Sequence, residues 1–413
     1  MELRNGMPYW LIKNGLLNNY EKLSGDTETQ VLIIGGGISG AMNAYFLANA
    51  GVDCVLVEKG AIAQGSTCTS TSLLQYELDT PLSLLSEQIG FRQASRAYHL
   101  GAEAIDDLRY IMQTLKCDEF EKSGSLFYAS TKKDETLIKE EFEIRKKAGL
   151  HVEYLNGNEV EARFGFKTTN AIYSSHAACV DPYKLTHALL QYVIKKGVQV
   201  FNHTGLTDIN YESEGVTVRT NTGFSIKAKQ IVNASGGFTQ KFIDQYPLRL
   251  YNSYAIISEP GVNESTLNAA EKCMFLSSAN PYLYIRTTSD QRIVVGGRDE
   301  AWVDGNQGDR ILKTKSRQLA ADFKRLFGTE LKTEYSWSGV YTGTADTLPL
   351  VGAVSTVPHT FFTTGFGGNG ITLSLVAAEI IRDKLLGHSH RDEELFSFER
   401  KTAMAKEFVK HPS

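Results

Sequence analysis

The sequence predicts an α/β fold in which a Rossmann-like dinucleotide-binding domain is assembled from separated segments, with a second domain inserted between them. Three observations carry this prediction. An apolar run at 31–34 meets a G-x-G-x-x-G turn at 35–40 and continues into an apolar helix. A second apolar run at 54–57 ends in an acid, Glu58. Another glycine-rich turn at 365–370 also feeds an apolar helix. A chain of 413 residues moreover exceeds one ordinary core, so two domains are expected.

The turn at 35–40 has the parts that a bound adenine dinucleotide requires. Gly35 permits the tight turn from strand to helix, Gly37 leaves room for a pyrophosphate, and Gly40 lets helix and sheet pack closely. The helix start offers unpaired N–H groups and partial positive charge to phosphates. Glu58 lies where an acid accepts hydrogen bonds from a ribose 2′-hydroxyl, and it disfavours a 2′-phosphate. The alternative is a glycine-rich turn that binds nothing.

The other elements follow from hydrophobic periodicity and turn residues. The helix that begins at Asp181 is well marked, because Asp181 can cap it, Pro182 suits its first turn and Gly197 ends it. In chain order, the expected helices are 103–115, 134–149, 181–196, 309–327 and the one from the second glycine turn to 386. The expected strands are 124–130, 198–201, 215–220, 224–228, 250–258, 282–286, 292–297 and 360–364. Residues 215–228 are expected to form a hairpin, and the apolar run 230–237 ends in small residues that allow a close approach to a ligand.

Composition and charge argue against several classes of function. Hydrophobic residues make up 42% and charged residues 22%, which is globular composition. The net charge of −4 gives no basic surplus for nucleic acid. No stretch approaches a transmembrane segment, and the N-terminus lacks a signal-peptide core. Five scattered cysteines and nine histidines without ligand spacing argue against disulfides and a metal. We therefore expect a cytoplasmic protein.

Several segments together resemble the FAD-dependent amine and amino-acid oxidase superfamily, which includes D-amino-acid oxidase, glycine oxidase and monomeric sarcosine oxidase. The resemblance covers about 28–390 and looks closest to bacterial members whose substrates are unassigned. The segments are VLIIGGGISG (31–40) with Glu58, QGSTCTSTSLL (64–74), CVDPYKL (179–185), IVNASGGF (231–238), and the pair WSGVYTGTADTLPLVG (337–352) and TGFGGNGITLS (364–374).

The resemblance implies how the chain divides into domains. An FAD-binding domain would comprise 26–115, 152–243 and 335–405. An inserted α+β substrate domain with a mixed, mainly antiparallel sheet would comprise 116–151 and 244–334. Residues 1–25 would form an N-terminal extension.

The resemblance also implies a non-covalent FAD. Its site would combine the first glycine turn and its acid, the loop 64–74, the end of the run 231–238 and the second glycine turn. These residues are Gly35, Gly37, Ile38, Ser39, Gly40, Glu58, Lys59, Ser66, Thr67, Ser70, Thr71, Ala234, Gly236, Gly368, Asn369, Gly370, Ile371 and Thr372. A solvated Ser/Thr turn is the alternative for 66–71. Cys68 does not match the positions at which relatives attach FAD covalently.

The substrate site departs from the better-known relatives. The residue matching the carboxylate-binding arginine of glycine oxidase is Tyr341, and the residue matching the corresponding lysine of sarcosine oxidase is Thr372. A carboxylate prefers a guanidinium to a hydroxyl, so an α-amino acid held in the usual way is in doubt. The substrate-binding candidates are Tyr254, Tyr284, Arg286, Tyr341 and Thr372.

Two further side chains near these candidates have alternative interpretations. Arg286 is a replacement anchor if 282, 284 and 286 share a face toward the substrate, and otherwise lies on an exposed face of a sheet. Glu77 is a candidate for attracting a cationic amine, although a surface carboxylate is the preferred interpretation.

The resemblance implies an FAD-dependent oxidoreductase that oxidises a C–N bond of a small amine or amino-acid derivative. Hydride would pass to flavin N5, and the imine product would hydrolyse. The electron acceptor would be oxygen or an unknown carrier. No catalytic side chain is certain, because the flavin supplies the chemistry. The alternatives are oxidation of a hydroxy acid or other alcohol, for which His176 and His203 are poor candidates as base, and a non-catalytic flavin-binding protein.

Overall fold

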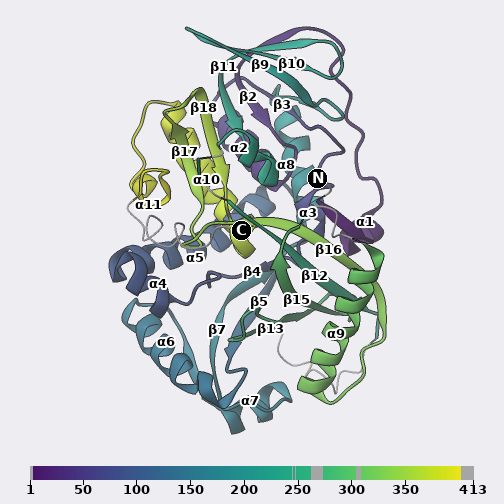
Figure 1. Cartoon of the computed structure of the whole chain (residues 1–413), viewed down its shortest axis with the longest axis vertical. Helices are drawn as coiled ribbons and strands as arrows, with labels where there is room; N and C mark the ends of the chain where they lie inside the picture. The colour runs from purple at the N-terminus through teal and green to yellow at the C-terminus, as the bar shows by residue number, and fades with distance from the viewer. Residues whose placement is uncertain (1–2, 244, 247, 262–272, 304–307, 401–413) are drawn as a thin grey trace.

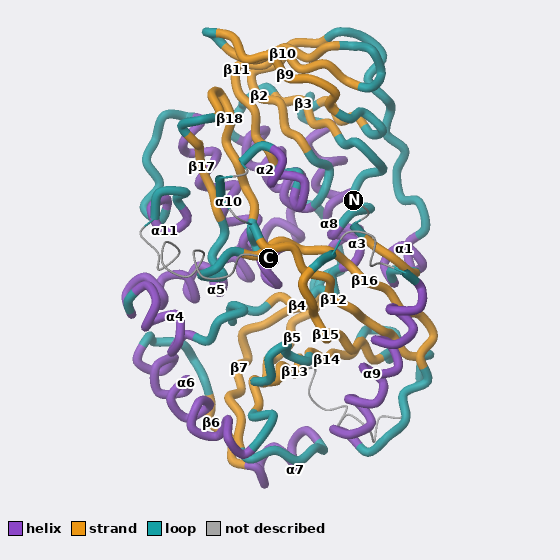
Figure 2. Tube along the Cα trace, viewed as in Figure 1, coloured by secondary structure: helices purple, strands orange, loops and turns teal. Residues whose placement is uncertain are grey.

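Two β-sheets organise the chain, one in the upper and one in the lower half of Figure 1. The computed structural model describes residues 3–243, 245–246, 248–261, 273–303 and 308–400. Figure 2 shows the strands of the two sheets in orange, with helices around them. The protein is thus a mixed α/β fold, as the sequence predicts.

The upper sheet is mostly parallel and has the doubly wound character expected of a dinucleotide-binding domain. Its order is β17-β18-β11-β2-β3-β8, and the hairpin β9-β10 extends it from β11. The strands are β2 (Thr27–Ile34), β3 (Cys54–Val57), β8 (Gln199–Phe201), β9 (Leu206–Glu212), β10 (Gly215–Thr220), β11 (Ser225–Asn233), β17 (Leu350–Val354) and β18 (Val357–Thr364). Strand β11 joins the expected strand 224–228 and the apolar run that follows it into one element.

Helices α2, α8, α10 and α5 pack together behind this sheet and share one large core with it. They span Ile38–Asn49 (α2), Phe91–Thr114 (α5), Pro182–Ile194 (α8) and Gly370–Leu385 (α10). Asp181 caps α8 as expected, because its carboxylate accepts the Lys184 N–H at 2.9 Å. Helix α5 begins well before the expected residue 103. Ala94, Ala97 and Gly101 continue its buried face, but a search for large apolar side chains does not detect such small residues.

The lower sheet is mixed and mainly antiparallel, in the order β1-β16-β12-β15-β14-β13-β5-β7-β4, with β6 paired to β7. Only the β13–β5 pair among these described strands is parallel. The strands are β1 (Arg4–Gly6), β4 (Leu73–Leu74), β5 (Glu121–Tyr128), β6 (Glu153–Asn156), β7 (Asn170–Cys179), β12 (Arg249–Ser258), β13 (Cys273–Ser277), β14 (Tyr284–Thr287), β15 (Ile293–Ala301) and β16 (Thr333–Gly343).

Helices flank the lower sheet on both of its ends (Figure 1). Helix α9 packs on β12, β15 and β16, and its bounds match the expected helix 309–327. The flanking helices are α4 (Leu82–Ile89), α6 (Glu135–Lys147), α7 (Gly157–Phe164) and α9 (Asp309–Phe327), and short helices are α1 (Tyr9–Asn14), α3 (Ser66–Thr69) and α11 (Glu393–Phe396).

The sheets divide the chain differently from the expected domains. Strands β6 and β7 fall inside 152–243, which was expected in the FAD-binding domain, yet they pair with each other and with β5. Strand β16 falls largely inside 335–405, yet it pairs with β12. These strands belong to the lower sheet, so the boundaries expected from the resemblance do not follow the sheets.

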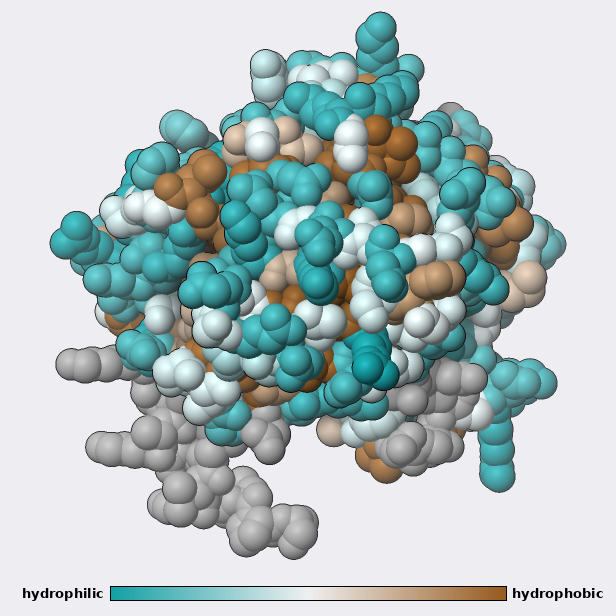
Figure 3. Space-filling model, turned by 90° about the horizontal axis from the view of Figure 1, so that it is seen from above, coloured by the Kyte–Doolittle hydropathy of each residue, from teal (hydrophilic) through white to brown (hydrophobic). Residues whose placement is uncertain are grey.

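The surface seen from the β9–β10 end is mainly hydrophilic, with apolar side chains visible in separate areas between polar ones (Figure 3). None of the described helices combines the length and apolar composition needed to cross a bilayer.

The N-terminal extension ties the two halves together. Strand β1 pairs with β16, from Arg4 opposite Gly339 to Gly6 opposite Trp337. Helix α1 then lies against α3 and α8. The Trp10 indole is buried and donates a hydrogen bond to Ser70 O at 2.6 Å. This segment therefore holds the loop 64–74 from outside.

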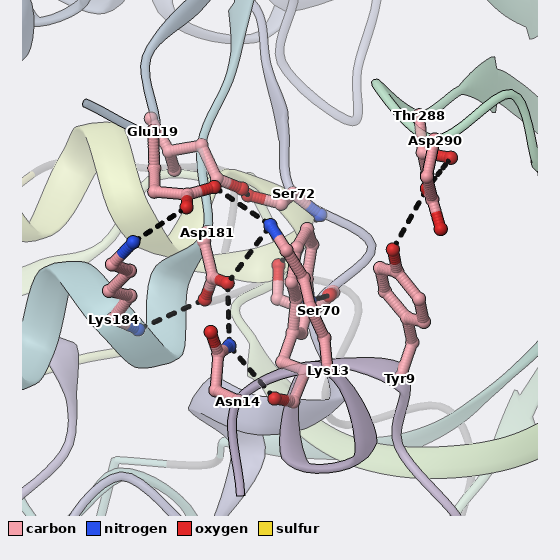
Figure 4. Close-up of polar contacts among 12 residues, drawn as sticks. Tyr9, Lys13, Asn14, Ser70, Ser72, Glu119, Asp181, Lys184, Thr288 and Asp290 are labelled. Atoms are coloured by element: carbon pink, nitrogen blue, oxygen red, sulfur yellow. Dashed lines mark hydrogen bonds and ion pairs between the residues drawn. The ribbon is translucent and has the colours of Figure 1, made fainter. Parts of the chain in front are cut away.

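Polar contacts of Tyr9, Lys13 and Asn14 also fix helix α1, as Figure 4 shows. The Lys13 ammonium lies 2.8 Å from a Glu119 oxygen and 3.7 Å from an Asp181 oxygen. The Asn14 amide donates to the same Asp181 oxygen, Oδ2, at 2.7 Å, and Tyr9 OH donates to Asp290 at 3.0 Å. Helix α1 thus contacts the start of α8 and the turn after β14 at once.

A buried ion network supports the segment between β4 and α4. The Arg145 guanidinium lies 2.7 Å from Glu141 and 3.2 Å from Glu77, and all three side chains are buried. Glu141 also accepts the N–H groups of Leu82 and Ser83 at the start of α4. Burial alone would raise the pKa of Glu141, but the Arg145 charge and these N–H groups hold it below its usual value. The expectation that Glu77 lies at the surface is wrong, because Glu77 pairs with a residue distant in sequence.

We expect Arg145→Met to lower the free energy of unfolding by about 3–5 kcal/mol, because it leaves two buried carboxylates without their cation. Denaturant unfolding of the purified protein measures this. Lys139→Met on the same helix is the matched control, since its partner Glu135 is exposed, and it should leave the midpoint unchanged. Equal effects of the two variants would contradict the assignment.

We expect Trp10→Ala to lower stability by about 3–5 kcal/mol, the usual cost of removing a buried tryptophan side chain. The loop 64–74 should also exchange its amide hydrogens faster, because the contact to Ser70 is lost. Hydrogen exchange read by mass spectrometry measures the second effect. Leu16→Ala, in the same extension but 86% exposed, should change neither property.

Candidate active site

The first glycine turn forms a backbone cradle at the carboxyl ends of β2 and β11. Gly35 has φ of 111°, and a Cβ there would lie 2.5 Å from Ala234 O. A Cβ on Gly40 would overlap Gly35 O. The turn therefore requires glycine at both positions, and it leaves the N-terminus of α2 open to a ligand. The Ser39 hydroxyl in the first turn of α2 is buried and has no hydrogen-bond partner in the described chain.

Glu58 closes the cradle from the end of β3. One carboxylate oxygen accepts the Gly36 N–H and the other accepts the Gly60 N–H, both at 2.7 Å. The side chain is thereby fixed beside the turn, where the sequence places an acceptor for a ribose hydroxyl. The ammonium of the next residue, Lys59, lies 5.5 Å from the centre of the Phe238 ring.

The loop 64–74 runs between the two sheets, and its residues are buried or half-buried. The Thr67 hydroxyl accepts the Ile38 N–H at 3.0 Å, so this side chain lies at the N-terminus of α2. The Ser66 hydroxyl instead donates to Val340 O at 2.5 Å on β16. Thr67, Cys68 and Thr69 are buried, which rules out the alternative of a solvated turn for 67–69. The Cys68 thiol donates to Gly65 O, and burial raises its pKa to about 12.

The remaining loop residues face the N-terminal extension and β14. Ser70 contributes its carbonyl to Trp10, and its hydroxyl accepts the Ser72 N–H at 3.1 Å. Thr71 O accepts the Arg286 Nε–H at 2.6 Å. These contacts fix the loop's path, so Ser70 and Thr71 hold the loop through backbone as well as side-chain atoms.

The second glycine turn, 367–369, leads into α10 and packs on the segment 75–79. Gly368 N–H donates to an Asp79 oxygen at 2.9 Å, and the Asn369 amide donates to Glu77 O at 2.9 Å. A Cβ on Gly367 or Gly368 would collide with the Asp79 carboxylate. The Thr372 hydroxyl is buried and donates to Asn369 O, while Ile371 lies in the core. Because α10 packs beside α2, both helix N-termini belong to one region of the fold (Figure 1).

Together these residues fit a bound FAD. The glycines of the two turns allow close approaches of the chain that a side chain would prevent, and a Cβ on Gly236 would meet no atom within 4 Å. Two helix N-termini follow the turns, and Glu58 supplies an acceptor beside the first. Ala234 follows the end of β11, and its carbonyl lies directly against Gly35, so it borders the same cradle. Gly236 lies two residues further along the chain.

Beside the second turn lies a pocket rich in phenols and carboxylates. Tyr282 OH donates to Asp79 at 3.2 Å, and Tyr341 OH donates to Asp299 Oδ2 at 2.8 Å. Ser253 and Tyr284 share a hydrogen bond of 2.9 Å. We name Asp79, Tyr251, Ser253, Tyr282, Tyr284, Asp299 and Tyr341 the acidic pocket.

The two carboxyl groups of the acidic pocket have raised pKa values. Burial raises the pKa of Asp299 to about 6, and the negative charge of Asp79 adds to this, while the nearby Ser253 and Tyr341 hydroxyls and Lys315 lower it. Burial also raises the pKa of Asp79, although the hydrogen bonds from the Gly368 N–H and the Tyr282 hydroxyl lower it. The two acids therefore act on one another in one low-dielectric site.

The structure brings some of the predicted substrate candidates together and separates others. Tyr284 and Tyr341 lie in the acidic pocket, and Thr372 lies behind the second turn. Tyr254 lies on the opposite face of β12, packed with α9 and bonded to Glu300. Its neighbour Ser253 faces the pocket instead, because side chains alternate along a strand.

Arg286 is buried, so the alternative of an exposed sheet face is wrong. Its guanidinium donates to Thr71 O and Thr287 O and lies 5.4 Å from the centre of a Trp10 ring. It lines a small cavity of about 20 Å³ that Asp181 and Glu119 also line. Its charge is therefore directed toward the N-terminal extension.

Several residues of the pocket were not singled out from the sequence. Asp79 and Asp299 carry no motif spacing, although Asp299 belongs to the segment GGRDE at 296–300. The histidines weighed as bases lie elsewhere: His176 is on β7, 3.2 Å from Ala102 O, and His203 is exposed.

Comparison with known proteins agrees with this geometry. Residues 30–384 match the family model described as DAO, FAD dependent oxidoreductase. Gamma-glutamylputrescine oxidoreductase of Escherichia coli K12 is 23% identical over 384 residues, covering 90% of this chain and 87% of the relative. Glycine oxidase of Bacillus licheniformis is 26% identical over 395 residues, covering 90% and 98%.

The fold is also that of solved members. The crystal structure of glycine oxidase from Geobacillus kaustophilus superposes with a TM-score of 0.74 at 19% identity, covering 91% of this chain and 99% of the other. The family match spans both glycine turns, the loop 64–74 and the acidic pocket. The chain belongs to the DAO family of FAD-dependent oxidoreductases.

Proposed function

We propose that this protein oxidises a C–N bond of a small amine or amino-acid derivative, with FAD held between the first turn of α2 and the turn at 367–369. The observation that carries the proposal is the acidic pocket beside Gly368. Its carboxylate and phenol oxygens, such as those of Asp299 and Tyr341, accept hydrogen bonds from N–H groups of an amine. Two of the relatives are named for an amine or amino-acid substrate, namely gamma-glutamylputrescine and glycine.

When bound, FAD supplies the hydride acceptor. The chain's own residues then have to bind and orient the substrate so that the C–H bond beside nitrogen faces the cofactor. Asp79 and Asn369 fix the second glycine turn. The dipole of α10, whose N-terminus follows that turn, would favour negative charge at the edge of a cofactor bound there.

The test is anaerobic mixing of the purified yellow protein with panels of amines, amino acids and 2-hydroxy acids. We expect at least one amine or amino acid to bleach the visible flavin band, and the hydroxy acids to leave it unchanged. The described pocket holds carboxylates and phenols but no imidazole for the hydroxyl proton. Bleaching by hydroxy acids alone would contradict the proposal, and a flavin that no compound reduces would favour a non-catalytic protein.

We expect Glu58→Gln to weaken FAD binding by about tenfold or more, since charge-assisted hydrogen bonds contribute about 1.5–3 kcal/mol. Reconstitution of the apoprotein with FAD, followed by the recovery of flavin absorbance, gives the dissociation constant. Glu28→Gln is the matched control, because Glu28 is an exposed carboxylate on β2 of the same sheet. An unchanged dissociation constant for Glu58→Gln would remove Glu58 from the cofactor site.

A further inference from the structure

The acidic pocket has the opposite charge to a site that anchors a carboxylate. Asp299 and Asp79 are its ionisable acids, and the Tyr341 hydroxyl donates to Asp299. The basic side chains on neighbouring elements are already paired. Lys315 lies 2.7 Å from Glu300, and Arg298 lies 2.6 Å from Asp322.

Arg286 does not neutralise the acidic pocket either. Its guanidinium is bound to two backbone carbonyls and lies close to the Trp10 ring, on the side of the N-terminal extension. Its positive charge lowers the pKa of Tyr9 there, although burial and Asp290 raise that pKa overall.

One oxygen of Asp299 lacks a partner. Oδ2 accepts the Tyr341 hydroxyl, whereas Oδ1 is buried and has no hydrogen-bond partner in the described part of the chain. A buried carboxylate oxygen left unsatisfied is costly, so such an atom is a candidate for binding a donor that enters from outside. The side chain nevertheless keeps partial solvent access, which leaves a path for a ligand.

Aromatic rings surround the same carboxylate. The Tyr251 and Tyr341 rings stack with centroids 5.3 Å apart, and the Tyr282 and Tyr284 rings are 5.8 Å apart. Ring faces attract cations, most strongly when the cation is desolvated. Two acids without a cation and four tyrosine rings are a combination that suits an alkylammonium group and disfavours a carboxylate.

We infer that the substrate carries an ammonium group, which Asp299 Oδ1 and the tyrosine rings bind, and that it carries no carboxylate at this end. This inference rests on the proposed function, because it names the class of amine that the same pocket takes. Asp299 is then the residue that sets specificity for a cationic amine over an amino acid.

The experiment uses the FAD-loaded protein and three probes of one shape. Tert-butylammonium, pivalate and tert-butanol are cationic, anionic and neutral, and tert-butylamine has no C–H bond beside nitrogen that could be oxidised. Calorimetry and the perturbation of the flavin spectrum report binding without turnover. We expect tert-butylammonium to bind about tenfold or more tightly than either of the others.

Asp299→Asn should weaken tert-butylammonium binding by about tenfold or more and should not weaken pivalate. Glu300→Gln is the matched control, because this next carboxylate on β15 bonds Tyr254 and Lys315 away from the pocket. It should leave tert-butylammonium binding unchanged. Both variants should keep the visible flavin spectrum, which shows that they fold and hold FAD.

The pH dependence gives a second, independent readout. The titratable groups around Asp299 are Asp79, Tyr282, Tyr284, Tyr341 and Lys315. The pKa values of the three tyrosines are raised, so they stay neutral, and Lys315 is paired with Glu300.

Binding of tert-butylammonium should therefore be strongest above pH 6 and weaken as the pH falls and Asp299 takes a proton. Tyr341→Phe removes a donor to the Asp299 carboxylate, raises its pKa and should move this transition to higher pH.

The results separate this inference from the proposed function. Pivalate binding as tightly as tert-butylammonium, no binding of either ion, or unchanged cation binding in Asp299→Asn would each overturn the inference. The proposed function fails separately, if tert-butylammonium binds but no amine bleaches the flavin under anaerobic conditions.

Discussion

The close approach of backbone to backbone at Gly35 and Gly40 is the constraint on which the site depends. With Gly40 against Gly35 O and Gly35 against Ala234 O, the ends of β2 and β11 and the start of α2 occupy one small volume. The position of α2 follows from this contact. Helix α10 packs along α2, which brings the second glycine turn, far away in the sequence, into the same half of the fold. Side chains add specificity to an arrangement that backbone atoms have already set.

The lower sheet meets this cradle through a few short connections. The loop 64–74 leaves the first β-α-β unit, bonds to Ile38 through Thr67 and to Val340 through Ser66, and enters the lower sheet as β4. The segment 75–79 continues from it and holds the second turn through Asp79 and the carbonyl of Glu77. The Arg145 network beneath fixes that segment to α4 and α6. One continuous stretch of chain therefore contacts both glycine turns, which couples the geometry of the two turns.

Sequence patterns predict the parts of this protein that depend on local chemistry. The bounds of α9, the Asp181 cap of α8, the β10–β11 hairpin and both glycine turns follow from spacing and turn residues. Pairing between distant segments does not follow from such local patterns. Sequence patterns therefore did not assign β7 and β16 to the lower sheet. The same limit applies to side chains. Tyr254 and Ser253 are neighbours on β12 but lie on opposite faces of that strand. Glu77, in the segment after β4, is buried and pairs with Arg145 of α6, which is distant in sequence. The role proposed for Asp299 depends on its interactions with Tyr341 and Asp79. No local sequence pattern connects these three residues.

The pairing of β1 with β16 has a consequence for the order of folding. Residues 4–6 leave the ribosome long before residues 337–339, and their strand has no partner until nearly all of the lower sheet has been synthesised. Strand β1 stays unpaired until β16 has joined β12 and β15 in the lower sheet. Contacts between segments so far apart in sequence close late, because they carry the largest loop entropy. Strand β1 consequently takes its place at the edge of the lower sheet only after β16 has been synthesised.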